Sequence, residues 1–299
     1  MTVEKYYRVT TMSINYGFIP CAGKGTRMGD LGREIAKPLW RVFDKSMLEV
    51  QTEYLSSFFN VKEIVINTHH NHYQFEKIKD LKILHEEKLL GSGGNIHNFK
   101  KNYPRAEKII VMNPDINIFF SEKDLINLKL QIQENDFLMV CLPVPKNSSY
   151  NEVCVNSKGF FVEVNGPNKD KDYITYSGMG SINLKEINYV AGESGFFDTV
   201  INKKRNCSIF VPKDHFEYWD WGSLDLYTKN IKEISRPGHE SMLKNFLIEI
   251  DALDPACLFP QSYRSTLPNS YVFTHKEQIA TENTIIFSDS DGIEYSVEI

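Results

Sequence analysis

The chain has 299 residues, of which 41% are hydrophobic and 24% charged, so it can bury a full core as one globular domain with an appendage or as two small domains. Its net charge of -5 argues against general nucleic-acid binding, which needs a clustered excess of Lys and Arg. The five cysteines form no Cys-x-x-Cys pair, which argues against a zinc knuckle or a disulfide framework and favours the reducing cytoplasm.

The first predicted feature is a strand that runs into a glycine-rich turn. Residues 1–14 are expected to form a polar arm, and the apolar run ending at Pro20 predicts the strand. Gly23 and Gly25 follow it, and glycines in such a turn let bare backbone N–H groups approach an anion. Arg27 and Lys37 add positive charge nearby. The stretch favours a phosphate-binding loop, with an ordinary strand-to-helix loop as the alternative.

The spacing of this loop differs from two common phosphate loops. Gly17 and Gly23 are separated by five residues where a Walker A loop has four, and Gly25 follows Lys24 where a hydroxyl residue would hold magnesium. The glycines also miss the Gly-x-Gly-x-x-Gly dinucleotide spacing. Asp44 lies at a suitable distance for a ribose, so a dehydrogenase remains a weak alternative.

Downstream, short apolar runs alternate with segments of helical spacing, which predicts a parallel α/β sheet with right-handed crossovers. Ser46 and Glu49 are spaced as a capping box at the start of one helix. Ligands of such a sheet bind beyond the carboxyl ends of its strands. Asp115 follows one strand there, where it either caps a turn or faces a ligand. The predicted strands are 63–68, 82–85 and 108–112, and the predicted helices are 46–59, 73–78 and 95–101.

From about residue 136 the pattern becomes rich in strands, as expected for a substrate-holding half. A loop over 219–223 is expected to lead into a helix over 224–234, and the run over 241–250 is helical or strand-like. Residues 231–299 are otherwise expected to be a strand-rich extension. The predicted strands are 137–142, a hairpin over 152–164 that turns near 157–159, 173–184, 207–211, 271–273, 284–287 and 295–299, and a short helix is predicted over 196–203.

Six sequence elements occur in an order that resembles the sugar-1-phosphate nucleotidyltransferases, or nucleotide-sugar pyrophosphorylases, over roughly residues 16–230. The spacing from Arg27 to Lys37 matches the family's opening signature. The elements are Cys21–Met28 with Lys37-Pro38-Leu39, Leu90–Ile96, Val111–Asp115, Phe161-Val162-Glu163, Ser177-Gly178 and Trp219–Ser223.

The resemblance implies a Rossmann-like, GT-A-like mixed sheet flanked by helices in a nucleotidyltransferase domain over 15–230, followed by a small strand-rich extension over 231–299. It implies transfer of a nucleotidyl group from an NTP to a sugar 1-phosphate, giving an NDP-sugar and pyrophosphate. The expected partners are these small molecules, with no nucleic acid and no membrane, and a homo-oligomer is compatible with the sequence.

The resemblance also implies roles for individual residues. Arg27 and Lys37 would be the catalytic cations, and Asp115 and Asp220 would hold the cofactor Mg²⁺. The nucleotide would be bound by Ala22, Gly23, Gly25, Thr26, Arg27, Gly91, Ser92, Gly93 and Asn113, and the sugar by Asn151, Glu163 and Gly178.

Nucleotidyl transfer suits these residue types independently of the resemblance. The attacking group would be a phosphate monoester oxygen, which is already ionised near pH 7, so no general base is required. The task is to bring two polyanions together for direct in-line attack. Backbone N–H groups, an Arg, a Lys and a divalent ion held by carboxylates are suited to it.

Departures from the family pattern lie mainly on the sugar side. Asn151 stands where a glycine is common, Val164 replaces a lysine, and Pro114 replaces a glycine. They leave open a cytidylyltransferase acting on phosphocholine or another small phosphorylated alcohol. A non-catalytic subunit that binds nucleotide sugars is a third alternative, against which the two retained aspartates, Asp115 and Asp220, speak. The loop over 91–94 leans toward relatives that use GTP or UTP.

Overall fold

The structure is a computed structural model that describes residues 14–28, 31–78, 81–202, 205–236, 238–253, 271–273, 284–288 and 294–298. The predicted polar arm lies outside the described residues except for Ile14, which is buried. Among the described helices, none has the length and apolar character needed to cross a membrane.

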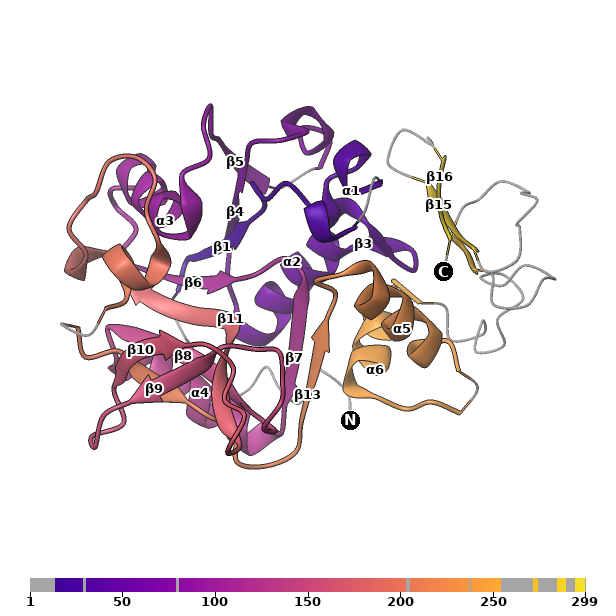
Figure 1. The fold of residues 1–299 in the computed structure, drawn as a ribbon. Helices are drawn as coiled ribbons and strands as arrows, with labels where there is room; N and C mark the ends of the chain where they lie inside the picture. The colour runs from indigo at the N-terminus through magenta and orange to yellow at the C-terminus, as the bar shows by residue number, and fades with distance from the viewer. Residues whose placement is uncertain are drawn as a thin grey trace.

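A seven-stranded sheet forms the centre of the fold (Figure 1). Its order is β12-β8-β11-β6-β1-β4-β5. Strands β6, β1, β4 and β5 are parallel, whereas β11 is antiparallel to both β6 and β8. The expected mixed sheet is therefore confirmed. The strands are β1 (Tyr16–Pro20), β4 (Glu63–Thr68), β5 (Leu81–His85), β6 (Lys108–Met112), β8 (Phe137–Val144), β11 (Tyr173–Asn183) and β12 (Ser208–Phe210).

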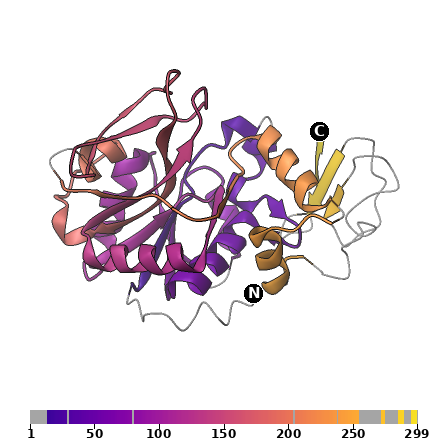
Figure 2. The same cartoon turned by 90° about the horizontal axis from the view of Figure 1, so that it is seen from below.

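Side chains of the central strands alternate between two hydrophobic clusters, one on each face of the sheet. In β1, Phe18 joins one cluster and Ile19 the other, and in β6 Val111 and Met112 divide in the same way. The long helix α4 (Glu122–Glu134) lies along one face, and the hairpin of β9 (Glu152–Val155) and β10 (Phe161–Asn165) stands on the other side (Figure 2). The hairpin predicted over 152–164 is confirmed.

Helix α2 (Met47–Phe59) begins as the sequence predicts. The Ser46 hydroxyl accepts from the Glu49 N–H at 3.2 Å, and the Glu49 carboxylate accepts from the Ser46 N–H at 2.7 Å. This reciprocal pair satisfies two backbone donors at the helix start. The capping box is confirmed.

The helix predicted over 73–78 is wrong, because only a 3₁₀ turn, η4 (His72–Gln74), forms there. The polar side chains Asn71 and Gln74 instead donate to the carbonyl oxygens of Arg33 and Glu34. Within 71–78, the only side chain that is fully buried is Phe75, so this described segment has no apolar stripe with which to stabilise a helix.

Residues 116–134 carried no prediction from sequence, yet they form β7 (Ile116–Phe120) and α4. All five residues of β7 are buried, the polar Asn117 included, so its burial does not alternate as it does in a half-exposed strand. It pairs antiparallel with β13 (Phe216–Asp220), outside the central sheet. The loop expected over 219–223 is therefore partly wrong, since Trp219 and Asp220 end a strand.

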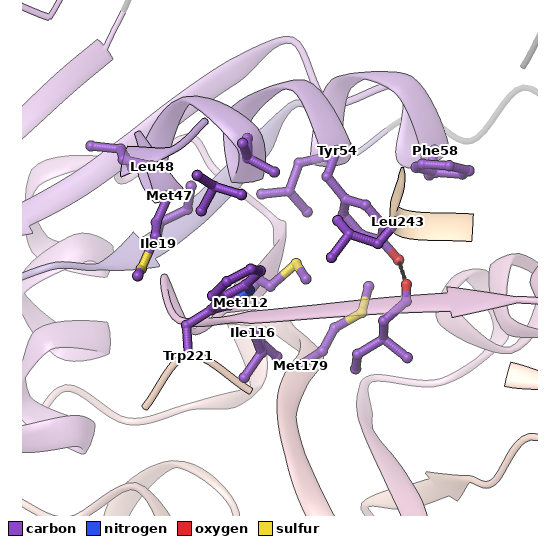
Figure 3. Close-up of a cluster of buried hydrophobic side chains, with 14 of the residues drawn as sticks. Ile19, Met47, Leu48, Tyr54, Phe58, Met112, Ile116, Met179, Trp221 and Leu243 are labelled. Carbon is purple, nitrogen blue, oxygen red and sulfur yellow. Dashed lines mark hydrogen bonds between the residues drawn. The ribbon is translucent and has the colours of Figure 1, made fainter. Parts of the chain in front are cut away.

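The core packs directly behind this strand pair (Figure 3). Ile116 and Trp221 are fully buried with Tyr54 of α2, whose hydroxyl donates to the carbonyl oxygen of Ile118 in β7. The Trp221 indole N–H donates to the Asn117 side chain at 2.9 Å. These contacts fix the ends of both strands.

Helices α5 (Leu224–Ile234) and α6 (Met242–Glu249) complete this core, and α5 matches its predicted range. The run over 241–250 is thus helical. Strands β14 (Tyr271–Phe273), β15 (Thr284–Ser288) and β16 (Glu294–Glu298) form a separate three-stranded sheet, which agrees with the expected strand-rich end of the chain.

Removing the cap of α2 should destabilise the protein. Ser46→Ala deletes the hydroxyl that accepts from Glu49, and loss of such a cap costs about 1 kcal/mol. Urea unfolding should show that decrease in the free energy of unfolding. Ser57→Ala, inside the same helix, is the control and should not destabilise, because Ala is the better helix former there. Equal stability of Ser46→Ala and the wild type would show that the box contributes nothing.

Candidate active site

A cavity of about 580 Å³ opens at the carboxyl-end edge of the parallel strands, where ligands of such sheets bind. Cys21 follows β1, Glu86 follows β5 and Asn113 follows β6, and all three line the cavity. Ten of the site residues named from sequence also line it. They are Ala22, Gly23, Gly25, Thr26, Arg27, Lys37, Gly91, Ser92, Asn113 and Asp115.

The glycine loop runs from the end of β1 into a 3₁₀ turn, η2 (Thr26–Met28). Gly25 has φ +64°, and a Cβ there would lie 2.8 Å from the Gly32 carbonyl oxygen, so only glycine fits without strain. The Gly25 carbonyl accepts from the Met28 N–H at 2.9 Å. The turn leaves the Arg27 side chain exposed at the cavity wall, where a cation can meet an anionic ligand.

Lys37 and Asp115 form an ion pair at the cavity. The Lys37 Nζ lies 2.5 Å from Asp115 Oδ2, and the two side chains are only 10% and 16% exposed. The ion pair holds an ammonium group at the cavity wall, where it can meet an anionic ligand. Binding of phosphates would require the ammonium to share or leave its carboxylate partner.

Asp220 lies beside Asp115, although it does not line the cavity itself. The register of β13 on β7 sets Asp220 opposite Ile116, and the Trp221 N–H donates to the Asp115 carbonyl at 2.9 Å. The Asp220 carboxylate accepts from the Gly222 N–H at 2.6 Å and from the Tyr150 hydroxyl at 2.5 Å.

Burial and the hydrogen bond to Asp220 raise the pKa of Tyr150, so the phenol stays protonated and donates. Burial also raises the pKa of the Cys21 thiol, with a further contribution from the charge of Asp115. Because the thiolate is the reactive form, Cys21 is suited to packing and not to nucleophilic attack.

The two aspartates suit Mg²⁺, which takes oxygen ligands and is often held by one or two carboxylates together with substrate phosphates. In the described part of the chain, no group of three or more His, Cys, Asp or Glu side chains is arranged to hold a metal. The carboxylate pair therefore fits an ion that enters with phosphates better than a metal fully enclosed by protein.

Glu86 is a buried carboxylate at the cavity that sequence reasoning missed. It is 3% exposed, and its oxygens accept from the Asn67 amide at 2.8 Å and the Leu90 N–H at 3.2 Å. Asn67 in turn accepts from the Cys21 N–H at 2.8 Å. The same wall holds Asn95, whose buried Oδ1 has no hydrogen-bond partner among the described residues. Glu86 and Glu87 are neighbours in the sequence, and no sequence pattern indicates which of the two side chains is buried.

The glycines of the second loop are part of a helix, since α3 spans Gly91–Asn102 and begins four residues before its predicted start at residue 95. The N–H groups of Gly93 and Gly94 donate to the Ser194 carbonyl at 2.8 and 3.3 Å, and Gly93 does not line the cavity. In this structure Gly93 thus contacts a second chain segment, residues 192–200.

The segment 192–200 includes a π-helical turn, η6 (Phe196–Val200), where a short helix over 196–203 was predicted. Phe196, Phe197 and Tyr176 form an aromatic wall of the cavity, with Tyr176 and Phe196 stacked at 5.8 Å. The residues named for sugar binding do not line the cavity, and their role stays a prediction. Asn151 and Glu163 are exposed, and the Gly178 carbonyl accepts from the N–H of the cavity residue Asn113 at 2.9 Å.

The comparisons with known proteins agree with this arrangement. Residues 17–161 match the family described as "MobA-like NTP transferase domain". The chain is 30% identical over 146 residues to D-glycero-alpha-D-manno-heptose 1-phosphate guanylyltransferase of Campylobacter jejuni, which covers 44% of this chain and 58% of that protein. Over this part of its length the chain is therefore similar to NTP transferase domains and to a sugar-1-phosphate nucleotidyltransferase. The resemblance stated from its motifs is confirmed, and a dehydrogenase is not supported.

A further family relative is mannose-1-phosphate guanylyltransferase regulatory subunit alpha-A of Danio rerio, which is 28% identical over 145 residues, or 44% of this chain and 34% of that protein. The chain therefore spans 58% and 34% of the lengths of these two curated relatives. Crystal structures of HddC from Yersinia pseudotuberculosis, one complexed with GMP-PN, share the fold with a TM-score of 0.61 at 22% identity, covering 73% of this chain and 98% of HddC.

Gly93→Ala should destabilise the protein by pushing segment 192–200 away from α3. The added Cβ would lie 2.3 Å from the Gly195 carbonyl oxygen and 2.6 Å from Thr199 Oγ1, and overpacking of this kind costs about 1–3 kcal/mol. Chemical denaturation measures the loss. Gly166→Ala is the control, because nothing lies within 4 Å of a Cβ there. An unchanged midpoint for Gly93→Ala would contradict the close packing described above.

Proposed function

We propose that the protein transfers a nucleotidyl group from an NTP to a sugar 1-phosphate and releases pyrophosphate. The observation that carries the proposal is the cavity lined by both the exposed Arg27 and the Lys37–Asp115 pair, with Asp220 next to Asp115. It is supported by the match of residues 17–161 to an NTP transferase domain and by the similarity to a heptose 1-phosphate guanylyltransferase. The acceptor phosphate is ionised near pH 7, so positioning and charge neutralisation suffice for direct in-line attack.

Each residue has a proposed part in the reaction. The glycine loop and Arg27 would hold the triphosphate, and Lys37 would stabilise charge on the reacting phosphates. Asp115 and Asp220 would hold Mg²⁺, which supplies charge neutralisation at the phosphate oxygens. Because Lys37 already contacts Asp115, the lysine stands where the phosphates and the ion would meet.

We infer that the preferred nucleotide is GTP. The guanine edge presents an N1–H and an N2–H₂ donor side by side, which a carboxylate can accept together. The Glu86 carboxylate lines the cavity, and each of its oxygens accepts from one donor, Asn67 or Leu90, so both keep acceptor capacity. Two relatives with guanylyltransferase in their names support this choice. Both names refer to guanylyltransferases of sugar 1-phosphates, one as the transferase and one as a regulatory subunit, so the acceptor proposed here is a hexose or heptose 1-phosphate.

A non-catalytic subunit that binds nucleotide sugars is the second candidate, favoured by the match to a regulatory subunit. The two candidates differ in turnover and not in binding. Both aspartates and both cations are present in this chain, which supports the enzyme.

Pyrophosphate release should be seen with Mg²⁺, GTP and a hexose or heptose 1-phosphate, and not without the divalent ion. A panel of NTPs against phosphorylated sugars, with phosphocholine as a further acceptor, measures this directly. Asp115→Asn should lower the rate by orders of magnitude while the unfolding midpoint is retained, because it removes the charge that would hold the ion. Absence of pyrophosphate with every pair would leave the binding subunit as the better account.

Glu86→Gln should lower kcat/KM for GTP by about 10- to 100-fold, since hydrogen bonds to a charged group contribute about 1.5–3 kcal/mol. The rate with UTP should fall less, because uracil offers one N–H donor. Steady-state kinetics with both nucleotides measures the ratio. Glu87→Gln is the matched control, because the Glu87 side chain is exposed. Equal losses with GTP and UTP would indicate a structural role for Glu86 and count against base recognition.

A further inference from the structure

Tyr150 connects the loop between β8 and β9 to Asp220 at the end of β13. It lies in the loop between β8 and β9, next to Asn151, and its hydroxyl donates to Asp220 Oδ2 at 2.5 Å. Asp220 ends a strand of a different sheet. The contact therefore connects the loop before β9 to one of the two aspartates proposed to hold the ion.

The loop that carries Tyr150 is itself held in place. The buried Tyr173 of β11 donates its hydroxyl to the Tyr150 carbonyl at 2.6 Å and to the Ser148 carbonyl at 3.1 Å. The Tyr150 ring lies 6.4 Å from the ring of Tyr218 in β13, in an edge-on arrangement. The phenol thus reaches Asp220 from a fixed backbone and against a neighbouring ring.

The hydrogen bonds of Asp220 show what Tyr150 contributes. One carboxylate oxygen accepts from the Gly222 N–H at 2.6 Å, the other accepts from Tyr150, and the Asp220 carbonyl accepts from the Asn230 amide at 2.9 Å. Each carboxylate oxygen keeps a lone pair for a further ligand. Without the Tyr150 hydroxyl, one oxygen would lose the donor that fixes the rotation of the carboxylate.

We propose that Tyr150 is a positioning residue that orients the Asp220 carboxylate for a divalent ion and ties it to the loop between β8 and β9. The proposal rests on the proposed function, because it takes Asp220 as a ligand of that ion. Outer partners that hold a metal-binding carboxylate commonly contribute 10- to 100-fold in metal affinity. Tyr150 acts through Asp220 and needs no contact with the reacting atoms.

Binding of Mn²⁺ tests the proposal without turnover. Electron paramagnetic resonance of free Mn²⁺, titrated with the protein, gives the dissociation constant, and quenching of the tryptophan fluorescence, to which Trp219 and Trp221 beside Asp220 contribute, gives a second signal. Tyr150→Phe should raise the dissociation constant about 10- to 100-fold. Tyr189→Phe is the matched control, because that side chain is 50% exposed, and should bind Mn²⁺ as the wild type does.

Kinetics should separate positioning from damage to the fold. In Tyr150→Phe the Mg²⁺ concentration needed for half-maximal rate should rise by the same factor, while the rate at saturating Mg²⁺ recovers and KM for GTP is unchanged. A rate that stays low at every Mg²⁺ concentration would overturn the proposal. If Tyr150→Phe fails to fold, Tyr173→Phe, which releases only the loop backbone, should raise the Mn²⁺ dissociation constant by a smaller factor; no rise would overturn it.

Two further variants distinguish failure of this proposal from failure of the proposed function. If Asp220→Asn loses Mn²⁺ and Tyr150→Phe keeps wild-type affinity, the role of Tyr150 is wrong and the proposed metal ligand stands. If both Asp115→Asn and Asp220→Asn bind Mn²⁺ as tightly as the wild type, the metal assignment of the proposed function fails and the role of Tyr150 fails with it.

Discussion

The antiparallel pairing of β7 with β13 is the interaction on which the site depends. Ile116 and Trp221 are buried at the paired ends, and each is adjacent in sequence to an aspartate whose side chain is only partly covered. The energy that holds the carboxylates together is thus supplied by apolar burial behind them, because two like charges side by side repel one another. The positive Lys37 beside Asp115 offsets part of that repulsion.

Sequence patterns were sufficient wherever a local signal decided the structure. The capping box at Ser46, the helix over 224–234 and the parallel strands were readable because apolar periodicity and cap residues act over a few positions. The mixed sheet and the similarity to sugar-1-phosphate nucleotidyltransferases were predicted from the order of the motifs. The strand β7 was missed because all its residues are buried, the polar Asn117 among them, so the sequence does not separate a buried from an exposed face.

The parts of the site that were not predicted depend on contacts between distant residues. Glu86 and Glu87 are indistinguishable in sequence, and only the path of the chain after β5 buries the first and exposes the second. The sequence predicts that Gly93 binds a ligand. In the structure its N–H donates to the Ser194 carbonyl, and the Gly195 carbonyl leaves no room for a Cβ. Nothing in the local sequence of Tyr150 indicates that it contacts Asp220.

Because the chain is synthesised from its N-terminus, the residues of the candidate site become available at different times. The Ser92 hydroxyl is bonded to Phe196, and Asn117 to Trp221, across separations of 104 residues in each case. During synthesis the N-terminal part folds first, and contacts between distant segments form late. A nascent chain that has emerged only as far as β8 holds the glycine loop and Asp115 but lacks Asp220. Ribosome-bound fragments should therefore carry an incomplete site, and the chain gains its full set of carboxylates only after most of it has left the ribosome.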